Sequence, residues 1–138
     1  MNEIKSSKDC IFHLLNKVSR SGIRFWKSSV AEFGVTPVQA KVLTFLREMD
    51  NPTSAELGEE TALDSATLTG ILDRLESLSL LTRSPRIEDR RTVVVELTDH
   101  GKDTADKIFM KTGPANREFL KDLSPEESMM LRGLLKRF

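Results

Sequence analysis

Two adjacent arginines, Arg90 and Arg91, follow Asp89 directly before an apolar run of the chain. A guanidinium carries a lasting positive charge and several hydrogen-bond donors, so it suits phosphate oxygens and the negative potential of a narrow DNA minor groove. Asp89 would repel a phosphate, so its expected task is to hold one arginine in a fixed orientation through a charge-assisted hydrogen bond. The alternative is an exposed ion pair that contributes less than about 1 kcal/mol.

The segments on either side predict a β-hairpin with these arginines near its tip. Leu81–Arg86 and Arg91–Leu97 read as two strands, and the four residues 87–90 join them. Two further arginines, Arg83 and Arg86, lie on the first predicted strand. Residues 82–91 therefore hold four arginines against two carboxylates, a basic footprint that is weak by itself.

Three other segments carry complete helix-start signals. Residues 36–39 and 124–127 combine a capping hydroxyl, a proline at the first helical position and a side chain that reaches back; residues 53–56 have the same cap without the proline. Together with the apolar periodicity, these signals predict helices over about residues 8–31, 37–49, 54–60, 65–80, from 99 onward and 125–138. Pro114 is expected to kink or break the fifth of these helices.

The predicted helix after Asp64 has one face made of small and polar side chains, opposite a stripe of leucines and one isoleucine. A helix that enters a major groove about 12 Å wide needs small groups where its backbone approaches and short polar groups or methyls for base edges. Gly70 costs roughly 1 kcal/mol of helix stability relative to alanine. This cost favours the interpretation that the helix backbone at Gly70 has to approach DNA closely. On this face alone, solvated filler is an equally good interpretation. The outward and flanking positions are Ser65, Ala66, Thr67, Thr69, Gly70, Asp73, Arg74 and Ser77.

Length and composition limit the class of protein. A chain of 138 residues is most simply one domain, and its 21 basic and 21 acidic side chains leave a net charge of +0. The first ten residues are polar, and no apolar run approaches the roughly 20 residues of a membrane span. The single cysteine, Cys10, fits a reducing compartment. We expect a soluble, cytoplasmic protein without a membrane segment.

Nothing in the residue pattern indicates catalysis. The sequence shows no nucleophile–base pair and no phosphate-binding loop, and the two histidines, His13 and His100, are far apart in the chain. One cysteine cannot complete a metal site with a recognisable spacing. We therefore expect no enzyme activity, no metal site and no cofactor.

Three segments, in this order and spacing, resemble the MarR family of bacterial winged-helix transcription regulators, and the resemblance covers nearly the whole chain. Asp89 and Arg91, then Leu97-Thr98 after five residues, then Gly101, match its wing signature. Residues 63–76 are similar to its recognition helix, and residues 123–135 are similar to its terminal dimer helix. The implied fold class is mainly α with a small β-hairpin wing. It is a single domain, 1–138, with a winged helix-turn-helix lobe over about 36–97 and dimerisation helices over about 8–31 and 99–138.

The resemblance also implies which residues contact DNA. On the recognition helix these are Ser65, Ala66, Thr67, Thr69, Gly70 and Arg74. On the wing, Arg91 would enter the minor groove with Asp89 orienting it, and the candidates for phosphate contacts are Arg83, Arg86 and Arg90. Family members usually have a glycine just after the recognition helix, whereas this chain has Leu78-Ser79-Leu80-Leu81. A non-glycine residue must therefore either form that turn at some cost or reshape it, which leaves the exact end of the helix open.

The two terminal helices carry more apolar groups than chain ends normally leave in water. They include Phe12, Phe25, Trp26, Met129, Met130, Leu131, Leu134, Leu135 and Phe138. These groups predict a two-fold homodimer, and packing within one chain is the less favoured alternative. The resemblance further implies that a small aromatic or lipophilic effector, or oxidation of a cysteine, can release the protein from DNA. Peroxide-sensing relatives surround their cysteine with tyrosines and this chain has none, so Cys10 is expected to be an ordinary helical cysteine.

The function expected from the sequence is a double-stranded DNA-binding transcriptional regulator. It would act as a repressor, binding a pseudo-palindromic operator as a homodimer. The alternative from another class is a winged-helix protein-interaction module, in which the hairpin and the acidic segment 31–64 contact a protein instead of DNA.

Overall fold

The computed structural model describes residues 3–138; residues 1 and 2, part of the predicted single domain, lie outside the described chain. The described residues form six α-helices and one antiparallel hairpin, which confirms the predicted mainly helical fold class. Two 3-10 turns, Ser7–Asp9 and Ala31–Phe33, flank the first helix. The elements are α1 (Ile11–Val30), α2 (Pro37–Glu48), α3 (Ser54–Thr61), α4 (Ser65–Ser77), β1 (Leu81–Pro85), β2 (Val93–Leu97), α5 (Asp99–Phe119) and α6 (Pro125–Leu135).

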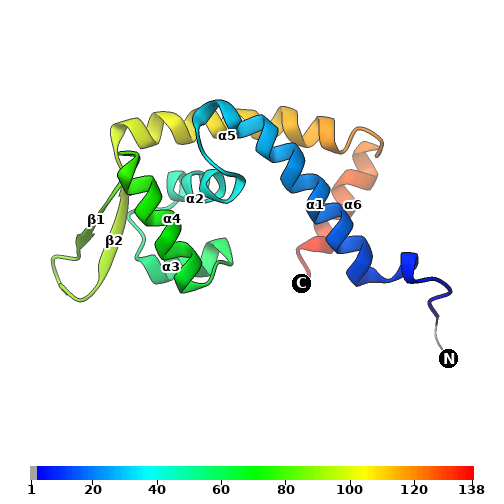
Figure 1. Cartoon of the computed structure of the whole chain (residues 1–138), viewed down its shortest axis with the longest axis horizontal. Coiled ribbons are helices and arrows are strands. Elements are labelled where there is room, and N and C mark those ends of the chain that lie inside the picture. Colours follow the sequence, from blue (N-terminus) through cyan, green and yellow to red (C-terminus); the bar gives the residue numbers. More distant parts are fainter. Residues whose placement is uncertain (1–2) are drawn as a thin grey trace.

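The elements divide between two ends of an elongated molecule (Figure 1). One end holds α2, α3, α4 and the hairpin, while α6 and the first half of α1 lie at the other, and α5 runs along both. The buried apolar core belongs to the first end, and every residue of α6 keeps part of its surface exposed. The core consists of Val30, Val35, Ala40, Val42, Leu43, Leu46, Leu57, Leu68, Ile71, Leu72, Leu75, Leu80, Leu81, Val95, Leu97, Ala105 and Ile108.

The helix starts are the best-predicted features of the chain. Thr36, Thr53 and Ser124 each accept a hydrogen bond from the backbone N–H three residues on, and the side chain of that third residue accepts from the N–H of the capping residue. Asp64 caps α4 by accepting from the N–H of Thr67 at 2.9 Å. These local exchanges confirm the predicted starts of α2, α3, α4 and α6.

Pro114 lies inside α5 and does not break it. Of the two predicted effects, a kink or a break, the break is wrong. The proline lacks the N–H that would bond to the carbonyl of Met110. Both Pro114 and Met110 are exposed, so water can serve that carbonyl. In the next turn the Asn116 side-chain amide donates to the carbonyl of Thr112 at 2.7 Å and supports the helix beyond the proline.

Two boundaries differ from prediction near residues of interest. The second strand begins at Val93, not at Arg91, so the loop between the strands covers residues 86–92 and holds Arg91. Cys10 is the N-cap of α1 and lies just outside the helix, partly exposed. Among the described helices, none combines the length and apolar character needed to cross a membrane.

The turn after α4 shows how the chain manages without the expected glycine. Ser79 adopts φ = 60°, in the left-handed region. Its N–H donates to the carbonyl of Glu76 at 2.9 Å, and the N–H of Leu80 donates to the carbonyl of Leu75 at 3.0 Å. This is the hydrogen-bond pattern that normally ends a helix on glycine, so the predicted strained turn is confirmed.

Thr98 connects that turn to the start of α5. Its hydroxyl donates to the carbonyl of Ser79 at 2.6 Å and accepts from the N–H of Gly101 at 2.9 Å. Its own N–H donates to the carbonyl of Leu80 at 3.1 Å. A Cβ at Gly101 would lie 1.8 Å from the Leu80 carbonyl oxygen, so only glycine fits there.

Replacing Ser79 with glycine should stabilise the fold. The left-handed conformation costs a non-glycine residue roughly 1–2 kcal/mol, and the extra freedom of glycine in the unfolded chain returns part of that. We expect Ser79→Gly to raise the free energy of unfolding by about 0.5–1 kcal/mol, measured by urea titration at one protein concentration. Ser77→Gly, two residues earlier in right-handed helix, should instead lower it by up to about 0.5 kcal/mol. A lower free energy of unfolding in both variants would contradict the strain at Ser79.

Candidate nucleic-acid interface

The small-residue face of α4 points outward. Ala66 and Gly70 are exposed, and a Cβ built at Gly70 meets no atom of residues 3–138 within 4 Å. Packing inside the chain therefore gives no reason for glycine at this position. The opposite side of the helix is buried through Leu68, Ile71, Leu72 and Leu75, as the periodicity predicted.

The three hydroxyls predicted to contact bases differ in how much hydrogen-bonding capacity remains available to a ligand. Thr67 donates its hydroxyl to the Asp64 carboxylate at 2.7 Å, and this bond lowers the pKa of Asp64, with the N–H of Thr67 adding to the effect. Thr69 is exposed and donates its hydroxyl to the carbonyl of Ser65 at 2.8 Å, so its oxygen can still accept a hydrogen bond. The Ser65 hydroxyl has no partner within residues 3–138. Ser65 and Thr69 are thus better placed than Thr67 to meet a base edge.

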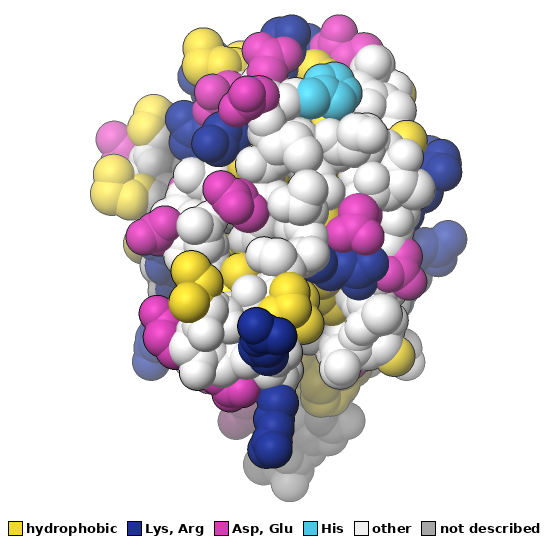
Figure 2. Space-filling view, turned by 90° about the vertical axis from the view of Figure 1, so that its left-hand side faces the viewer, with side chains coloured by type: hydrophobic (Ala, Val, Ile, Leu, Met, Phe, Trp, Pro, Cys, Tyr) yellow, Lys and Arg dark blue, Asp and Glu magenta, His cyan; other side chains and the backbone are white. Residues whose placement is uncertain are grey.

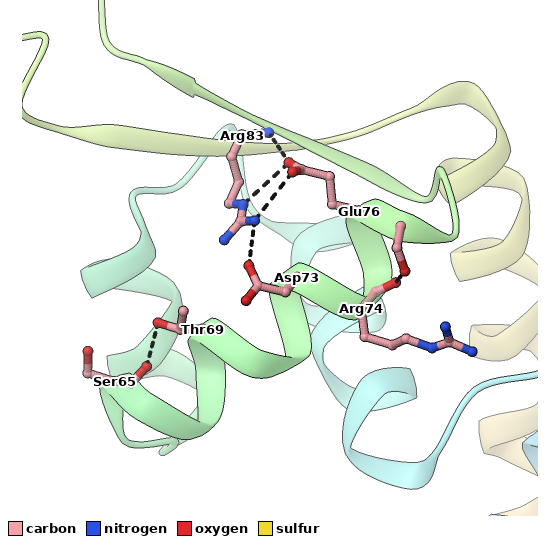
Figure 3. A network of polar contacts seen from close by, with 7 residues as sticks. Ser65, Thr69, Asp73, Arg74, Glu76 and Arg83 are labelled. Atoms are coloured by element: carbon pink, nitrogen blue, oxygen red, sulfur yellow. Dashed lines mark hydrogen bonds and ion pairs between the residues drawn. The ribbon is translucent and has the colours of Figure 1, made fainter.

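Arg74 does not lie with the other predicted contacts of α4. In Figure 3 it leaves the helix on the side away from Ser65, Thr69 and Asp73, which follow one another along one side of the helix. Arg74 is exposed, so it remains available to a phosphate beside the helix. Arg74 is therefore not placed to contact bases together with Ser65 and Thr69.

The loop between the strands is held by Asp89. The Asp89 carboxylate accepts from the N–H of Arg91 at 3.0 Å and from the hydroxyl of Thr92 at 3.1 Å. The N–H of Thr92 donates to the Asp89 carbonyl at 3.0 Å, and the N–H of Arg86 donates to the Thr92 carbonyl at 2.7 Å. Among residues 3–138, Asp89 holds backbone and hydroxyl groups, and the predicted bond to an arginine side chain is wrong.

This arrangement leaves the loop's own arginines exposed. Arg86, Arg90 and Arg91 all have exposed side chains, and none of them takes part in an ion pair within residues 3–138. Figure 2 shows the hairpin end of the molecule with basic and acidic side chains interspersed and a short column of basic groups toward its lower part. Positive charge is therefore local to a few side chains.

Arg83 is the exception among the arginines of the hairpin. Its guanidinium binds the carboxylates of Asp73 and Glu76 on α4, so it is not the free phosphate ligand that was predicted. The sequence contains the signal, since Asp73 and Glu76 lie one helical turn apart on the exposed side of α4. Pairing them with Arg83 requires knowing that β1 folds back beside this helix.

Within residues 3–138, no three His, Cys, Asp or Glu side chains lie together as metal ligands would. The surface offers a row of small groups, two exposed hydroxyls and four exposed arginines, Arg74, Arg86, Arg90 and Arg91, and these groups suit the binding of a polyanion.

Comparisons with known proteins point the same way. Residues 35–93 match the family model of the MarR family. The chain is 35% identical over 97 residues to the HTH-type transcriptional repressor NicR of Pseudomonas putida, a match that covers 70% of this chain. It spans about three fifths of the length of the first curated relatives it matches, 61% and 63%.

Two solved structures share the fold over nearly the whole chain. A cysteine-to-serine variant of MarR from E. coli, complexed with operator DNA, has a TM-score of 0.86 and 30% sequence identity, covering 92% of this chain and 91% of that chain. BpsR of Bordetella bronchiseptica, described with its regulation by 6-hydroxynicotinic acid, has a TM-score of 0.91 and 25% identity, covering 97% and 96%.

The contacts of Asp89 lead to a prediction about the free protein. Asp89→Ala removes the acceptor for the N–H of Arg91, so hydrogen exchange of that amide should become at least several-fold faster. Asp89→Asn keeps one side-chain oxygen and should retain most of the protection. Mass-spectrometric or NMR hydrogen exchange measures both variants. Equally fast exchange in the two would show that the carboxylate charge, and not the backbone hydrogen bond, orders the loop.

Proposed function

The chain belongs to the MarR family, and we propose that it is a sequence-specific regulator of transcription that binds double-stranded DNA. It acts as a repressor, in the cytoplasm, on a pseudo-palindromic operator. The observation that carries the proposal is the open surface at Gly70, where a helix exposes its backbone beside a loop of exposed arginines. The DNA-bound structure of MarR from E. coli, 30% identical to this chain, supports it.

The residues take distinct roles in this proposal. Ala66 and Gly70 let the backbone of α4 approach the floor of the major groove, and Ser65 and Thr69 meet base edges there. Arg91 enters the adjacent minor groove. Arg86 and Arg90 contact phosphates, as does Arg74 at the side of the helix, and Thr67 supports the helix start through Asp64.

A second copy of the chain completes the protein. Large apolar side chains remain exposed on α1, on the second half of α5 and on α6, among them Phe12 at 79%, Met110 at 75% and Met129 at 73%. Such a surface is costly in water, and its position at the end opposite the hairpin leaves the interface open. We propose a two-fold homodimer, which places half-sites about one helical turn of DNA apart.

We propose a small aromatic or lipophilic anion as the effector. A cavity of about 570 Å³ opens between α1 and α2, lined by Gly22, Ile23, Trp26, Pro37, Val38 and Lys41. Its lining is mainly apolar, and Lys41 is its one charged residue, which suits an aromatic ring that carries a carboxylate. BpsR, regulated by 6-hydroxynicotinic acid, supports this class of effector. Effector binding here would act where the terminal helices meet the DNA-binding lobe.

Selection of bound duplexes from a random pool tests the proposed function. We expect a two-fold-symmetric consensus, and the logarithm of the affinity for it should fall linearly with the logarithm of the salt concentration. Arg91→Ala should weaken binding by about 1–3 kcal/mol, and Thr69→Val should weaken the consensus more than random duplex. Lys107→Ala, which removes one positive charge from the exposed side of α5, is the matched control and should bind almost as the parent does. Binding without sequence preference or symmetry would favour the protein-interaction alternative.

A further inference from the structure

Arg83, in the middle of β1, is held by two carboxylates of α4. Its Nη2 donates to Asp73 Oδ1 at 2.6 Å and to Glu76 Oε1 at 3.3 Å, and its Nε donates to Glu76 Oε2 at 3.3 Å. The backbone N–H of Arg83 also donates to Glu76 Oε2, at 3.1 Å. Figure 3 shows the guanidinium between the two carboxylates, on the side of α4 that carries Thr69.

The charges in this cluster oppose phosphate binding. The hydrogen bonds that Arg83 donates to Glu76, followed by the one that it donates to Asp73, raise the pKa of Arg83, and the bonds to Glu76 lower the pKa of Glu76. Two carboxylates around one guanidinium leave a local charge of −1. A phosphate would have to compete with both for the donors of Arg83, whose side chain is only 25% exposed.

The cluster is also one of two sets of contacts that hold the hairpin, one on each strand. On the β2 side, the N–H of Val95 donates to the carbonyl of Pro52 at 2.8 Å, and Val94 pairs with Thr53. On the β1 side, Arg83 lies opposite Val95 and binds α4. Beyond this level only the pairs Ser84–Val94 and Pro85–Val93 remain before the loop. Arg83 is thus the outermost side-chain tie between β1 and α4.

We propose that Asp73 and Glu76 use Arg83 to fix the wing against the recognition helix, so that the two contact DNA as one rigid unit. Arg83 is then a positioning residue, and it sets the distance between the major-groove contacts of α4 and the minor-groove contact of the loop. The inference rests on the proposed function, because it concerns the geometry of DNA reading. It assigns to these acidic side chains a role in specificity without contact to a phosphate.

Salt dependence separates positioning from phosphate binding. Arg83→Gln should weaken binding to the selected consensus about 3–10-fold and leave the slope of log affinity against log salt unchanged. Arg91→Gln removes a charge that approaches DNA and should lower the slope by up to about 0.9. A fall of the same size in Arg83→Gln would overturn the inference, as would binding equal to the parent's.

The conservative variant supplies the second test. Arg83→Lys keeps the positive charge but cannot bind Asp73 and Glu76 in the same forked geometry. It should weaken consensus binding as Arg83→Gln does, whereas a phosphate ligand would be largely rescued by lysine. Rescue would therefore overturn the inference. Urea unfolding of each variant confirms that it is folded, and a second duplex selection with Arg83→Gln should lose sequence preference at the positions beside the wing.

The two proposals fail in different ways. Should the parent protein bind no duplex with sequence preference, the proposed function is wrong. If the parent binds its consensus and both Arg83 variants bind it as tightly as the parent does, the proposed function stands and the positioning role is wrong.

Discussion

The arrangement of α4, the hairpin and α5 depends on the contacts of the Leu80 carbonyl. It accepts the N–H of Thr98 and lies where a side chain at residue 101 would have to be. The end of α4, the base of the hairpin and the first turn of α5 meet around this oxygen, and each could move only if the others moved. The signature Leu-Thr-any-any-Gly therefore has a physical content. Leu97 is buried in the core, Thr98 joins the two turns through its hydroxyl, and Gly101 permits the approach.

Local interactions explain what the sequence could predict. A capping box involves four consecutive residues, so the starts at Thr36, Thr53 and Ser124 could be read directly. The exposed face of α4 follows from helical periodicity for the same reason. The partners of Arg83 could not be read, because they lie seven and ten residues away on a different element. Asp89 was assigned to a guanidinium because charge suggested it, whereas the nearest free donors in a tight loop are backbone N–H groups. The effect of Pro114 on α5 is smaller than the sequence predicts, because Pro114 and Met110 are exposed and water can bind the carbonyl that the proline leaves without a donor.

The distribution of apolar surface connects the two ends of the chain. The first half of α5 contributes Ala105 and Ile108 to the core of the lobe, while in the second half Met110 is exposed and Phe119 packs against Phe25 of α1. Two ion pairs, Arg47–Asp106 and Glu32–Lys111, fasten this helix to the lobe. In a homodimer, α5 would therefore carry any displacement at the subunit interface directly to the base of the hairpin. A ligand between α1 and α2 would act on the same connection.

A chain with no net charge can bind a polyanion when several carboxylates near the interface are already paired within the protein. Near the proposed interface, Asp64 accepts from Thr67, Asp89 accepts from the loop backbone, and Asp73 and Glu76 hold Arg83. Each of these acids holds a neighbouring group of the surface in place, and Arg74 and the loop arginines Arg86, Arg90 and Arg91 keep exposed side chains without an ion pair in the described chain. Long-range attraction from net charge is then weak, so affinity has to come from close contacts. Close contacts depend on shape, and for this reason the rigidity of the wing against α4 matters more here than in a strongly basic protein.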